Sequence, residues 1–581
     1  MRTPMERMFR CEDGTELFYR HWPASAAGAK GAVVMFHRGH EHSGRMQHIV
    51  DELDLSDLEF FAWDARGHGR SPGPRGFSPS LGTSVKDIDT FIRHIGKAHG
   101  IPASDIAILG QSVGGVLVSM WAHDYAPRVR CLVLASPAFK VKLYVPLARA
   151  GLKLLHALWG NFFVNSYVKA KVLTHDPGRV RSYEQDPLIA RPISVNILLG
   201  LYEGAERVVA DAAAIRIPTL LLISGSDWVV DLRPQHAFFD RLGADIKEKH
   251  VFAGFYHDTL GERDRHVALD SVRAFIRRIF GQLPVRAPLL DADRRGFTKA
   301  EFEMLQRPPA FVRRASYALT RLGMRSLGCL SDGIRLALAT GFDSGSTLDY
   351  VYRNRPSGVT ALGRGIDRFY LETVGWRGIR VRRRHLEAAL ARAAKRLHAA
   401  GRPVRVLDVA AGHGRYVLEV LKDLLGPDDR IVLRDYSEIN VREGRALIAA
   451  LGLQDRAEFR RGDAFDCDDL ARVTPRPTLG VVSGLYELFP ENEPIRGSLA
   501  GLAAAIESGG YLAYTNQPWH PQLELIARTL TSHRGRAPWV MRRRTQEEMD
   551  DLVAAAGFSK LDQWIDEWGI FSVSLAVRGT E

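Results

Sequence analysis

The sequence predicts an α/β protein of two domains. Its 581 residues exceed what a single hydrophobic core ordinarily holds, so more than one domain is expected. In both halves, short apolar runs of strand type alternate with helical stretches, a pattern typical of mostly parallel sheets covered by helices. Each half also places a glycine-rich turn between a strand and a helix, at Gly110–Gly114 and at Asp408–Gly414. We expect one fold to be organised around each turn.

Composition narrows the class of protein. Hydrophobic residues make up 46% and charged residues 25% of the chain, as in soluble globular proteins. The N-terminal residues lack the apolar stretch of a signal peptide, and no run of eighteen uncharged apolar residues predicts a transmembrane helix. The four cysteines lie far apart, which predicts reduced thiols in the cytoplasm and neither a disulfide framework nor a metal site.

The net charge of +12 is concentrated in the middle of the chain. Residues 286–402 contain 23 Lys and Arg against 10 Asp and Glu. Such a stretch suits contact with nucleic acid, an anionic membrane or an acidic substrate, or it simply solvates helices. No zinc finger or RNA-recognition motif is present, so we expect no nucleic-acid partner. Peripheral contact with the inner face of an anionic membrane stays open.

The strands of the first half follow one another with helices between them. Residues 15–22 alternate as an early antiparallel strand would, and the later runs are apolar throughout. Strands are expected at 15–22, 31–36, 60–64, 106–109, 131–137 and 218–227, with a last strand from His250 that is followed by a turn.

Gly110–Gly114 reads Gly-x-Ser-x-Gly between the strand at 106–109 and a buried helix from Gly115. A strand, a sharp turn and a helix form a nucleophile elbow, and we expect the glycines to permit its strained backbone. Ser112 is therefore the predicted nucleophile. A plain glycine-rich turn is the alternative.

An acid and a base follow the serine in the order that this arrangement requires. Asp227 ends the apolar strand from Pro218, and His257 lies in the turn after the last strand. Imidazole can take the serine proton and return it, and a carboxylate fixes its tautomer. Asp231 and Asp258 are rival acids, but neither ends an apolar strand.

The segment after the strand at 31–36 contains His37, His40 and His42. Three histidines so close together suit a metal. No further ligand pattern accompanies them, so we favour a loop whose backbone N–H groups face a developing oxyanion.

Four segments together resemble the monoacylglycerol lipase/lysophospholipase group of α/β-hydrolases: His37–Arg45, Asp64–Ser71, Gly110–Ser112 and Gly225–Asp227. The resemblance implies an α/β-hydrolase domain over residues 1–285, with oxyanion-hole N–H groups from Gly39 and Val113. It also implies an inserted cap at about 138–214. Amphipathic runs within 143–159 either pack on the core or lie on a membrane. The family usually has His-Gly at the first loop, where this chain has His37-Arg38, so Arg38 either crowds the pocket or attracts an anionic head group.

The region 286–375 is predicted as a linker at 283–288 followed by basic helices. We expect helix from Thr298 to about Ala339, a mixed stretch from Tyr350 to Trp376, and a helix from Arg380. This region is interpreted as a helical addition to the second domain.

The second half carries Asp-x-Ala-Ala-Gly-x-Gly at 408–414, between an apolar strand and a helix at 416–424. Glycines let the backbone approach a nucleoside closely, and Asp435, at the end of the next strand, is placed for ribose hydroxyls. Further strands are expected at 457–459 and 479–485.

These pieces resemble class I S-adenosylmethionine (SAM)-dependent methyltransferases with a Rossmann-like fold, over residues 376–581. The resemblance implies SAM as cofactor. A Rossmann domain without cofactor is the alternative. The implied cofactor-binding residues are Asp408, Ala410, Gly412, Gly414, Asp435, Asp463, Ala464 and Ser483. Candidate substrate contacts follow the fourth and fifth strands, at Tyr486, Glu487 and 516–520.

The fusion resembles bacterial bifunctional α/β-hydrolase/methyltransferase proteins. We expect a serine ester hydrolase acting on a lysophospholipid or monoacylglycerol-like lipid, joined to SAM-dependent methyl transfer to an oxygen or nitrogen acceptor. The alternative is that only one half is catalytic and the other is a binding or regulatory module.

Overall fold

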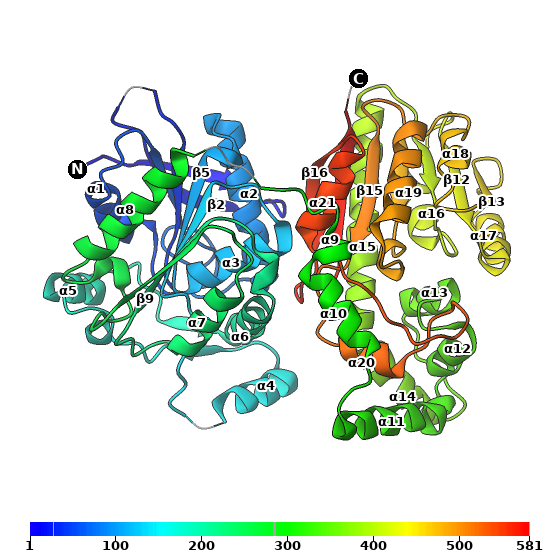
Figure 1. The fold of residues 1–581 in the computed structure, drawn as a ribbon, viewed down its shortest axis with the longest axis horizontal. Helices are drawn as coiled ribbons and strands as arrows, with labels where there is room; N and C mark the ends of the chain where they lie inside the picture. Colours follow the sequence, from blue (N-terminus) through cyan, green and yellow to red (C-terminus); the bar gives the residue numbers. More distant parts are fainter. Residues whose placement is uncertain (27, 146, 283–285, 580–581) are drawn as a thin grey trace. The chain divides into compact units, whose positions relative to one another are not determined.

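The computed structural model describes residues 1–26, 28–145, 147–282 and 286–579. The chain divides into two compact units, Met1–Arg286 and Ala287–Glu581 (Figure 1), and each is an α/β fold. Part of the predicted linker, residues 283–285, lies outside the described residues, as does Pro146 of the predicted cap.

The first unit is built on an eight-stranded sheet in the order β1-β2-β4-β3-β5-β6-β9-β10. Its strands are β1 Met5–Arg10, β2 Glu16–Trp22, β3 Ala32–Phe36, β4 Glu59–Trp63, β5 Ile106–Gln111, β6 Cys131–Ala135, β9 Thr219–Ser224 and β10 Lys247–Phe252. Six strands of this sheet run parallel: β4, β3, β5, β6, β9 and β10. Strands β1 and β2 are antiparallel additions at one edge. The seven predicted strands are confirmed. Strand β1 was not predicted, because five of its six residues are exposed and leave no apolar pattern.

Helices cover both faces of this sheet. Helices α1 (Gln47–Glu52) and α8 (His266–Phe280) pack in one core cluster with β3, β5 and β6. Helices α2 (Leu81–His99) and α3 (Val113–Tyr125) pack against each other, and α3 also contacts β5. The sheet therefore holds the end of β5, where Ser112 follows, between two helical layers.

A cap is inserted between β6 and β9. It comprises α4 (Ala148–Trp159), a small β7–β8 hairpin, α5 (Pro177–Gln185) and α6 (Val195–Ala210), with β7 at Phe163–Asn165 and β8 at Pro192–Ser194. Helix α6 packs on α3, whereas α4 buries no residue fully and lies at the lower edge of the first unit in Figure 1.

The second unit contains a seven-stranded sheet in the order β13-β12-β11-β14-β15-β17-β16. Its strands are β11 Arg405–Asp408, β12 Arg430–Asp435, β13 Ala457–Arg461, β14 Leu479–Val482, β15 Tyr511–Asn516, β16 Phe558–Ile565 and β17 Ser572–Arg578. The first five are parallel, and β17 and β16 add an antiparallel edge. Its helices are α15 Val374–Ala399, α16 Arg415–Leu421, α17 Glu438–Ala450, α18 Cys467–Ala471, α19 Asn492–Ala505, α20 Leu523–Thr529 and α21 Gln546–Ala555.

The middle of the chain is almost entirely helical and belongs to the second unit. Its helices are α9 Ala292–Arg295, α10 Phe297–Gln306, α11 Phe311–Arg325, α12 Asp332–Thr340, α13 Gly345–Arg353 and α14 Ala361–Leu371. The predicted mixed stretch at 350–376 is wrong in detail: it contains the end of α13 and all of α14. Two of their glycines, Gly345 and Gly363, lie where a Cβ atom would collide, Gly363 with the carbonyl oxygen of Leu330. Helix α15 also begins at Val374, before the predicted Arg380.

Among the described residues, no helix combines the length and apolar character that crossing a bilayer requires.

Candidate active sites

Ser112 occupies the turn between β5 and α3. Its backbone has φ 50° and ψ −113°, so the strain lies at the serine itself. The expected strained turn is present, and the neighbouring glycines permit it through close packing. A Cβ on Gly114 would lie 2.4 Å from the carbonyl oxygen of Phe36, so glycine is required there for close packing. The elbow is thus pressed against the end of β3, and the hydroxyl is directed away from the sheet.

The structure brings Ser112, His257 and Asp227 together in one hydrogen-bonded chain. Nε2 of His257 lies 2.7 Å from Oγ of Ser112, and its Nδ1 lies 2.7 Å from Oδ2 of Asp227. All three residues are buried. This arrangement lets the imidazole accept the hydroxyl proton while the carboxylate fixes its tautomer.

Asp227 is held ionised in this chain. Burial raises its pKa, but the imidazole of His257 and the backbone N–H groups of Val229 and Val230 outweigh burial and lower the pKa overall. The two rival acids have other partners: Asp231 caps α7 (Leu232–Arg241), and Asp258 pairs with arginines. Asp227 is the carboxylate that contacts His257.

A cavity of about 380 Å³ leads to Ser112. Gly39, Val113 and His257 line it beside the serine, so the two predicted oxyanion-hole residues lie at the nucleophile. The remaining wall is largely apolar and comes mostly from the cap, with Leu152, Leu155, Leu198, Leu201, Val164 and Ile193. The cavity can therefore accept an apolar chain with its reactive end at Ser112.

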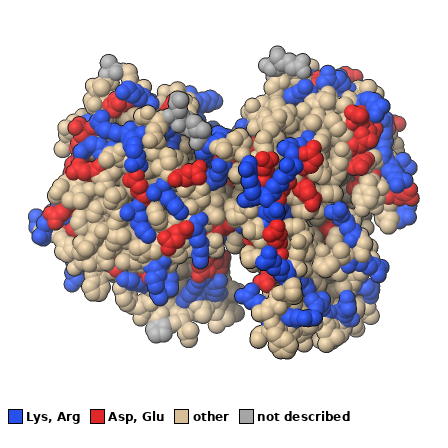
Figure 2. Space-filling view, in the orientation of Figure 1, with Lys and Arg blue, Asp and Glu red and all other residues tan. Residues whose placement is uncertain are grey.

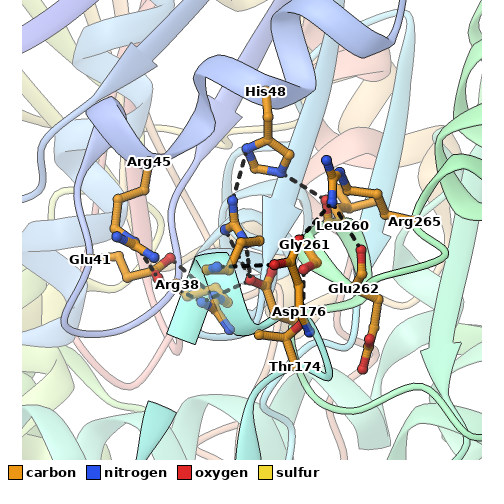
Figure 3. A network of polar contacts seen from close by, with 12 residues as sticks. Arg38, Glu41, Arg45, His48, Thr174, Asp176, Leu260, Gly261, Glu262 and Arg265 are labelled. Atoms are coloured by element: carbon orange, nitrogen blue, oxygen red, sulfur yellow. Dashed lines mark hydrogen bonds and ion pairs between the residues drawn. The ribbon is translucent and has the colours of Figure 1, made fainter. Parts of the chain in front are cut away.

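Arg38 takes part in a buried charge network (Figure 3). Its Nε and Nη2 donate to Glu41 at 3.0 and 2.6 Å, and Nη2 lies 3.3 Å from Asp258. Glu41 also accepts from Arg45, and Asp258 accepts from Arg179. Burial opposes ionisation of Glu41, yet the arginines lower its pKa well below the usual range. The guanidinium is thus tied to carboxylates, which accounts for arginine in place of glycine at this position.

Of the three histidines at 37, 40 and 42, His37 and His42 have different hydrogen-bond partners. Nε2 of His37 accepts the backbone N–H of Ala65, whereas Nε2 of His42 contacts Asp186 at 2.9 Å. A different trio, His21, Glu59 and His99, lies with ligand atoms within 4.8 Å of one another, although Nε2 of His21 already contacts Glu59 at 2.6 Å.

The glycine-rich turn of the second unit connects β11 to α16. Gly412 and Gly414 have φ of 58° and 72°, and a Cβ on Gly414 would lie 2.3 Å from Leu433. Oδ2 of Asp435, at the end of β12, accepts the N–H of Gly412 at 3.0 Å. A carboxylate beside a glycine turn at the carboxyl edge of a parallel sheet is the donor and acceptor set that a nucleoside cofactor needs.

Asp408 is fully buried beneath this turn. It accepts the hydroxyl of Tyr416 at 2.7 Å and the N–H of Ala410 at 3.4 Å. Burial raises its pKa to about 7 despite these hydrogen bonds. Its observed contacts order the turn.

The predicted cofactor residues separate into two groups. Ala410, Gly412, Gly414 and Ser483 line one cavity, and Asp408 and Asp435 support it through hydrogen bonds. Asp463 is exposed and accepts the N–H of Phe465, while Ala464 packs in a core cluster, so neither lines that cavity.

The same cavity has a volume of only about 30 Å³, because α13 covers it. Gly345, Leu348, Asp349 and Tyr352 of this helix form part of its wall, and Asp349 accepts from Nε of Arg415 at 2.6 Å. Sequence reasoning missed α13 and Arg382 as parts of this site. The basic run at 380–384 was the available signal for Arg382.

Comparison with known proteins matches both halves. A family model described as "Putative methyltransferase" matches residues 272–578, and one described as "Serine aminopeptidase, S33" matches residues 27–264. The chain is 55% identical over 579 residues to "Uncharacterized protein YnbC" of Escherichia coli K12, which covers 99% of both chains. It is 28% identical over 276 residues to a monoacylglycerol lipase of Mycolicibacterium smegmatis, covering 47% of this chain and 97% of that one.

Among solved structures, a monoacylglycerol lipase of Paleococcus ferrophilus is 25% identical with a TM-score of 0.40. It covers 48% of this chain and 99% of its own.

Proposed function

We propose that this chain is a bifunctional enzyme. It belongs to the putative methyltransferase family, and it also carries a hydrolase domain similar to monoacylglycerol lipases. The first unit cleaves a lipid ester through Ser112, and the second transfers a methyl group from SAM to an oxygen or nitrogen acceptor. The hydrogen-bonded chain from Ser112 through His257 to Asp227 is the observation that carries the first activity.

This geometry supports ester cleavage by the following steps. The Ser112 oxygen attacks the ester carbonyl carbon as its proton passes to Nε2 of His257. Backbone N–H groups of Gly39 and Val113 stabilise the oxyanion, and the imidazolium protonates the departing alcohol. Water then enters, and its oxygen attacks the acyl carbon as one of its protons passes to His257. The bond from the acyl carbon to Oγ of Ser112 breaks, the acid departs, and the imidazolium returns the proton to Oγ. The apolar cavity favours one long acyl chain, which suits a monoacylglycerol or a lysophospholipid.

A serine variant tests this half. Ser112→Ala should abolish hydrolysis of short p-nitrophenyl esters and labelling by a fluorophosphonate probe. Ser166→Ala, in the wall of the same cavity, is the matched control and should retain both. Undiminished hydrolysis by Ser112→Ala would refute the assignment. Absence of a fluorophosphonate adduct in the wild-type protein would instead favour the alternative that this half is a binding module.

In the second unit, Gly412, Gly414 and Ser483 are the residues that we propose to hold SAM, with Asp435 beside the turn. SAM, when bound, supplies a methyl group that is already activated, so the protein contributes mainly position and exclusion of water. Calorimetry should give SAM binding that weakens at least tenfold in Asp435→Asn. Asp463→Asn decides whether the exposed loop after β13 takes part: unchanged affinity would remove Asp463 from the site.

We further propose that the protein works at the cytoplasmic face of an anionic membrane. Helix α11 exposes Phe311, Val312, Leu319 and Leu322 among four arginines, and α4 exposes Leu154, Leu158 and Trp159 beside Lys153. Figure 2 shows Lys and Arg interspersed with uncharged surface where Figure 1 places α11 and α14. Mixed apolar and basic faces of this kind bind anionic bilayers. The fraction of protein that sediments with anionic vesicles should fall as the salt concentration rises. No binding to the vesicles at low salt would refute the proposal.

A further inference from the structure

The second unit contains a larger cavity next to its glycine-rich turn. It has a volume of about 410 Å³, which is in the range of small-molecule sites. Its wall is mostly apolar and comes from helices α11, α12, α13, α14, α15 and α20, from the loops after β14 and β15, and from the segments that follow α20 and precede β17. Representative residues are Ile334, Phe342, Trp376, Ile379, Met541 and Phe571. A cavity with this lining fits a long apolar body.

This cavity meets the proposed cofactor site. Leu348 and Arg382 line both the large cavity and the small one beside Gly412, while Ser483 and Gly484, which are consecutive after β14, line one each. A molecule in the large cavity can therefore present one end to the position at which we propose that SAM is held. The rest of such a molecule would lie among the helices of 311–371.

Buried polar groups gather on this side of the cavity. Arg382 and Gln517 are each 2% exposed and Glu487 is 7% exposed. Nη1 of Arg382 donates to Oε1 of Glu487 at 3.2 Å. Nε of Arg382, Oε2 of Glu487 and Nε2 of Gln517 have no hydrogen-bond partner within the described part of the chain. Unsatisfied buried groups are costly, so three of them in one wall indicate a polar ligand group.

His520 adds a donor. Its Nδ1 accepts the backbone N–H of Gln522 at 3.0 Å, so the neutral ring carries its proton on Nε2. Burial lowers its pKa to about 4, which keeps the ring neutral near pH 7. The wall thus offers donors from Gln517 and His520 and an acceptor from Glu487.

We propose that the methyl acceptor is an amphiphile with one long aliphatic chain that ends in a hydroxyl, bound in this cavity with the hydroxyl beside Glu487. The assignment rests on the proposed methyltransferase function. A hydroxyl both donates to Oε2 of Glu487 and accepts from Gln517 or His520. On transfer, the hydroxyl oxygen would take the methyl group as its bond to the SAM sulfur breaks, and the hydroxyl proton would pass to Oε2 of Glu487. A carboxylate has no proton to donate, so it would leave Oε2 of Glu487 without a partner even if it paired with Arg382.

Photolabelling of the full-length protein tests the assignment without reference to activity. The probe is 1-dodecanol with a diazirine at the far end of its chain, and labelled residues are mapped by peptide mass spectrometry. We expect labels around Met324, Ile334 and Phe369, on the helices of 311–371. Leu525→Trp, which fills the cavity from a half-buried position, should remove them. The matched control Ile193→Trp, in the cavity of the first unit, should leave them unchanged.

Competition identifies the polar end. Unmodified 1-dodecanol should displace the probe at about tenfold lower concentration than dodecyl methyl ether, because the ether cannot donate to Glu487. In the Glu487→Gln variant, the difference between the competing concentrations of 1-dodecanol and dodecyl methyl ether should be smaller. Stronger competition by dodecanoate than by dodecanol, or displacement of the probe by SAM, would overturn the assignment.

SAM calorimetry on the same samples separates the two hypotheses. SAM binding without labels in this cavity would refute the amphiphile site alone. Labels in the cavity without SAM binding would refute methyl transfer, and the assignment of an acceptor would fall with it.

Discussion

Two buried aspartates of this protein have opposite pKa shifts. Asp227 accepts backbone N–H groups and faces an imidazole, so its pKa is lowered although burial raises it. Asp408 has a tyrosine hydroxyl and one long backbone hydrogen bond, and burial raises its pKa to about 7. One carboxylate is therefore built to be charged, and the other carries a cost when charged.

Replacement of Asp227 isolates its role in orienting His257. Asp227→Asn should lower kcat for ester hydrolysis about a thousandfold or more, because an amide in place of the carboxylate favours the wrong imidazole tautomer. KM should change little. The variant Asp231→Asn, at the rival acid, is the control. Equal losses in both variants would contradict the role of Asp227.

Asp408 makes stability depend on pH. Its pKa is about 7 in the folded protein against an ordinary value of 3.8, so the folded state holds the extra proton between these values. The stability that Asp408 contributes is fully present below pH 3.8. This contribution is lost as pH rises from there through 7, on the order of 4 kcal/mol in all. Asp408→Asn, which can still accept from Tyr416, should therefore be more stable than wild type at pH 8.

Urea unfolding of wild type and Asp408→Asn at pH 5 and pH 8 measures this effect. The gap between the two proteins should widen with pH. A constant gap would show that the carboxyl group does not titrate as its burial predicts.

Replacing Arg38 with glycine, the residue usual in the related hydrolases, should destabilise this protein. Arg38→Gly would leave Glu41 and Asp258 buried with one fewer cation each. Breaking such a pair costs about 3–5 kcal/mol. Thermal unfolding should therefore begin at lower temperature, whereas Arg70→Gly, at a half-exposed pair with Glu6, should change little. Equal effects would contradict the importance of the network.

Among the secondary-structure elements, strands could be predicted from the sequence more accurately than helices. The apolar runs that became β3, β5, β6 and β9 are buried throughout, which makes them recognisable without neighbours. Strand β1 shows no such signal, because its stability comes from pairing with β2. Helix α14 was not predicted because it contains Gly363 and Gly365, of which Gly363 serves close packing with Leu330.

The candidate sites divide in the same way. Ser112 and Asp227 each follow a strand that is buried throughout, and His257 lies in the turn after β10, the last strand of the sheet. The order of strands was therefore enough to predict their meeting. Arg382 lies on α15, and its approach to Glu487 depends on how a helix packs over the sheet. That packing joins distant parts of the chain and leaves no local pattern.

Helix α4 carries a prediction of its own. Leu154→Asp and Leu158→Asp should reduce hydrolysis of long-chain monoacylglycerol presented in anionic vesicles several-fold, because both side chains are exposed on the cap. Hydrolysis of a soluble short ester should persist. Val267→Asp, an exposed position elsewhere in the same unit, is the matched control. Parallel losses on both substrates would point to damage of the cap instead.

For the whole molecule, the two sites should be separable by mutation. The proposed catalytic residues of ester cleavage lie within Met1–Arg286, and those of the cofactor and acceptor sites lie within Ala287–Glu581. Ser112→Ala should thus leave the affinity for SAM within twofold of wild type, and Asp435→Asn should leave short-ester hydrolysis unchanged. A reciprocal loss would demonstrate coupling between the units.

The position of α13 has a kinetic consequence. The cavity beside Gly412 and Gly414 has room for roughly two water molecules, so we expect a nucleoside to reach these glycines only when the helix moves away. The observed association rate then follows ligand concentration only while encounter is slower than opening. In a stopped-flow experiment the rate would level off at the opening rate of α13, and a substitution that loosens its contact with Arg415 would raise that plateau.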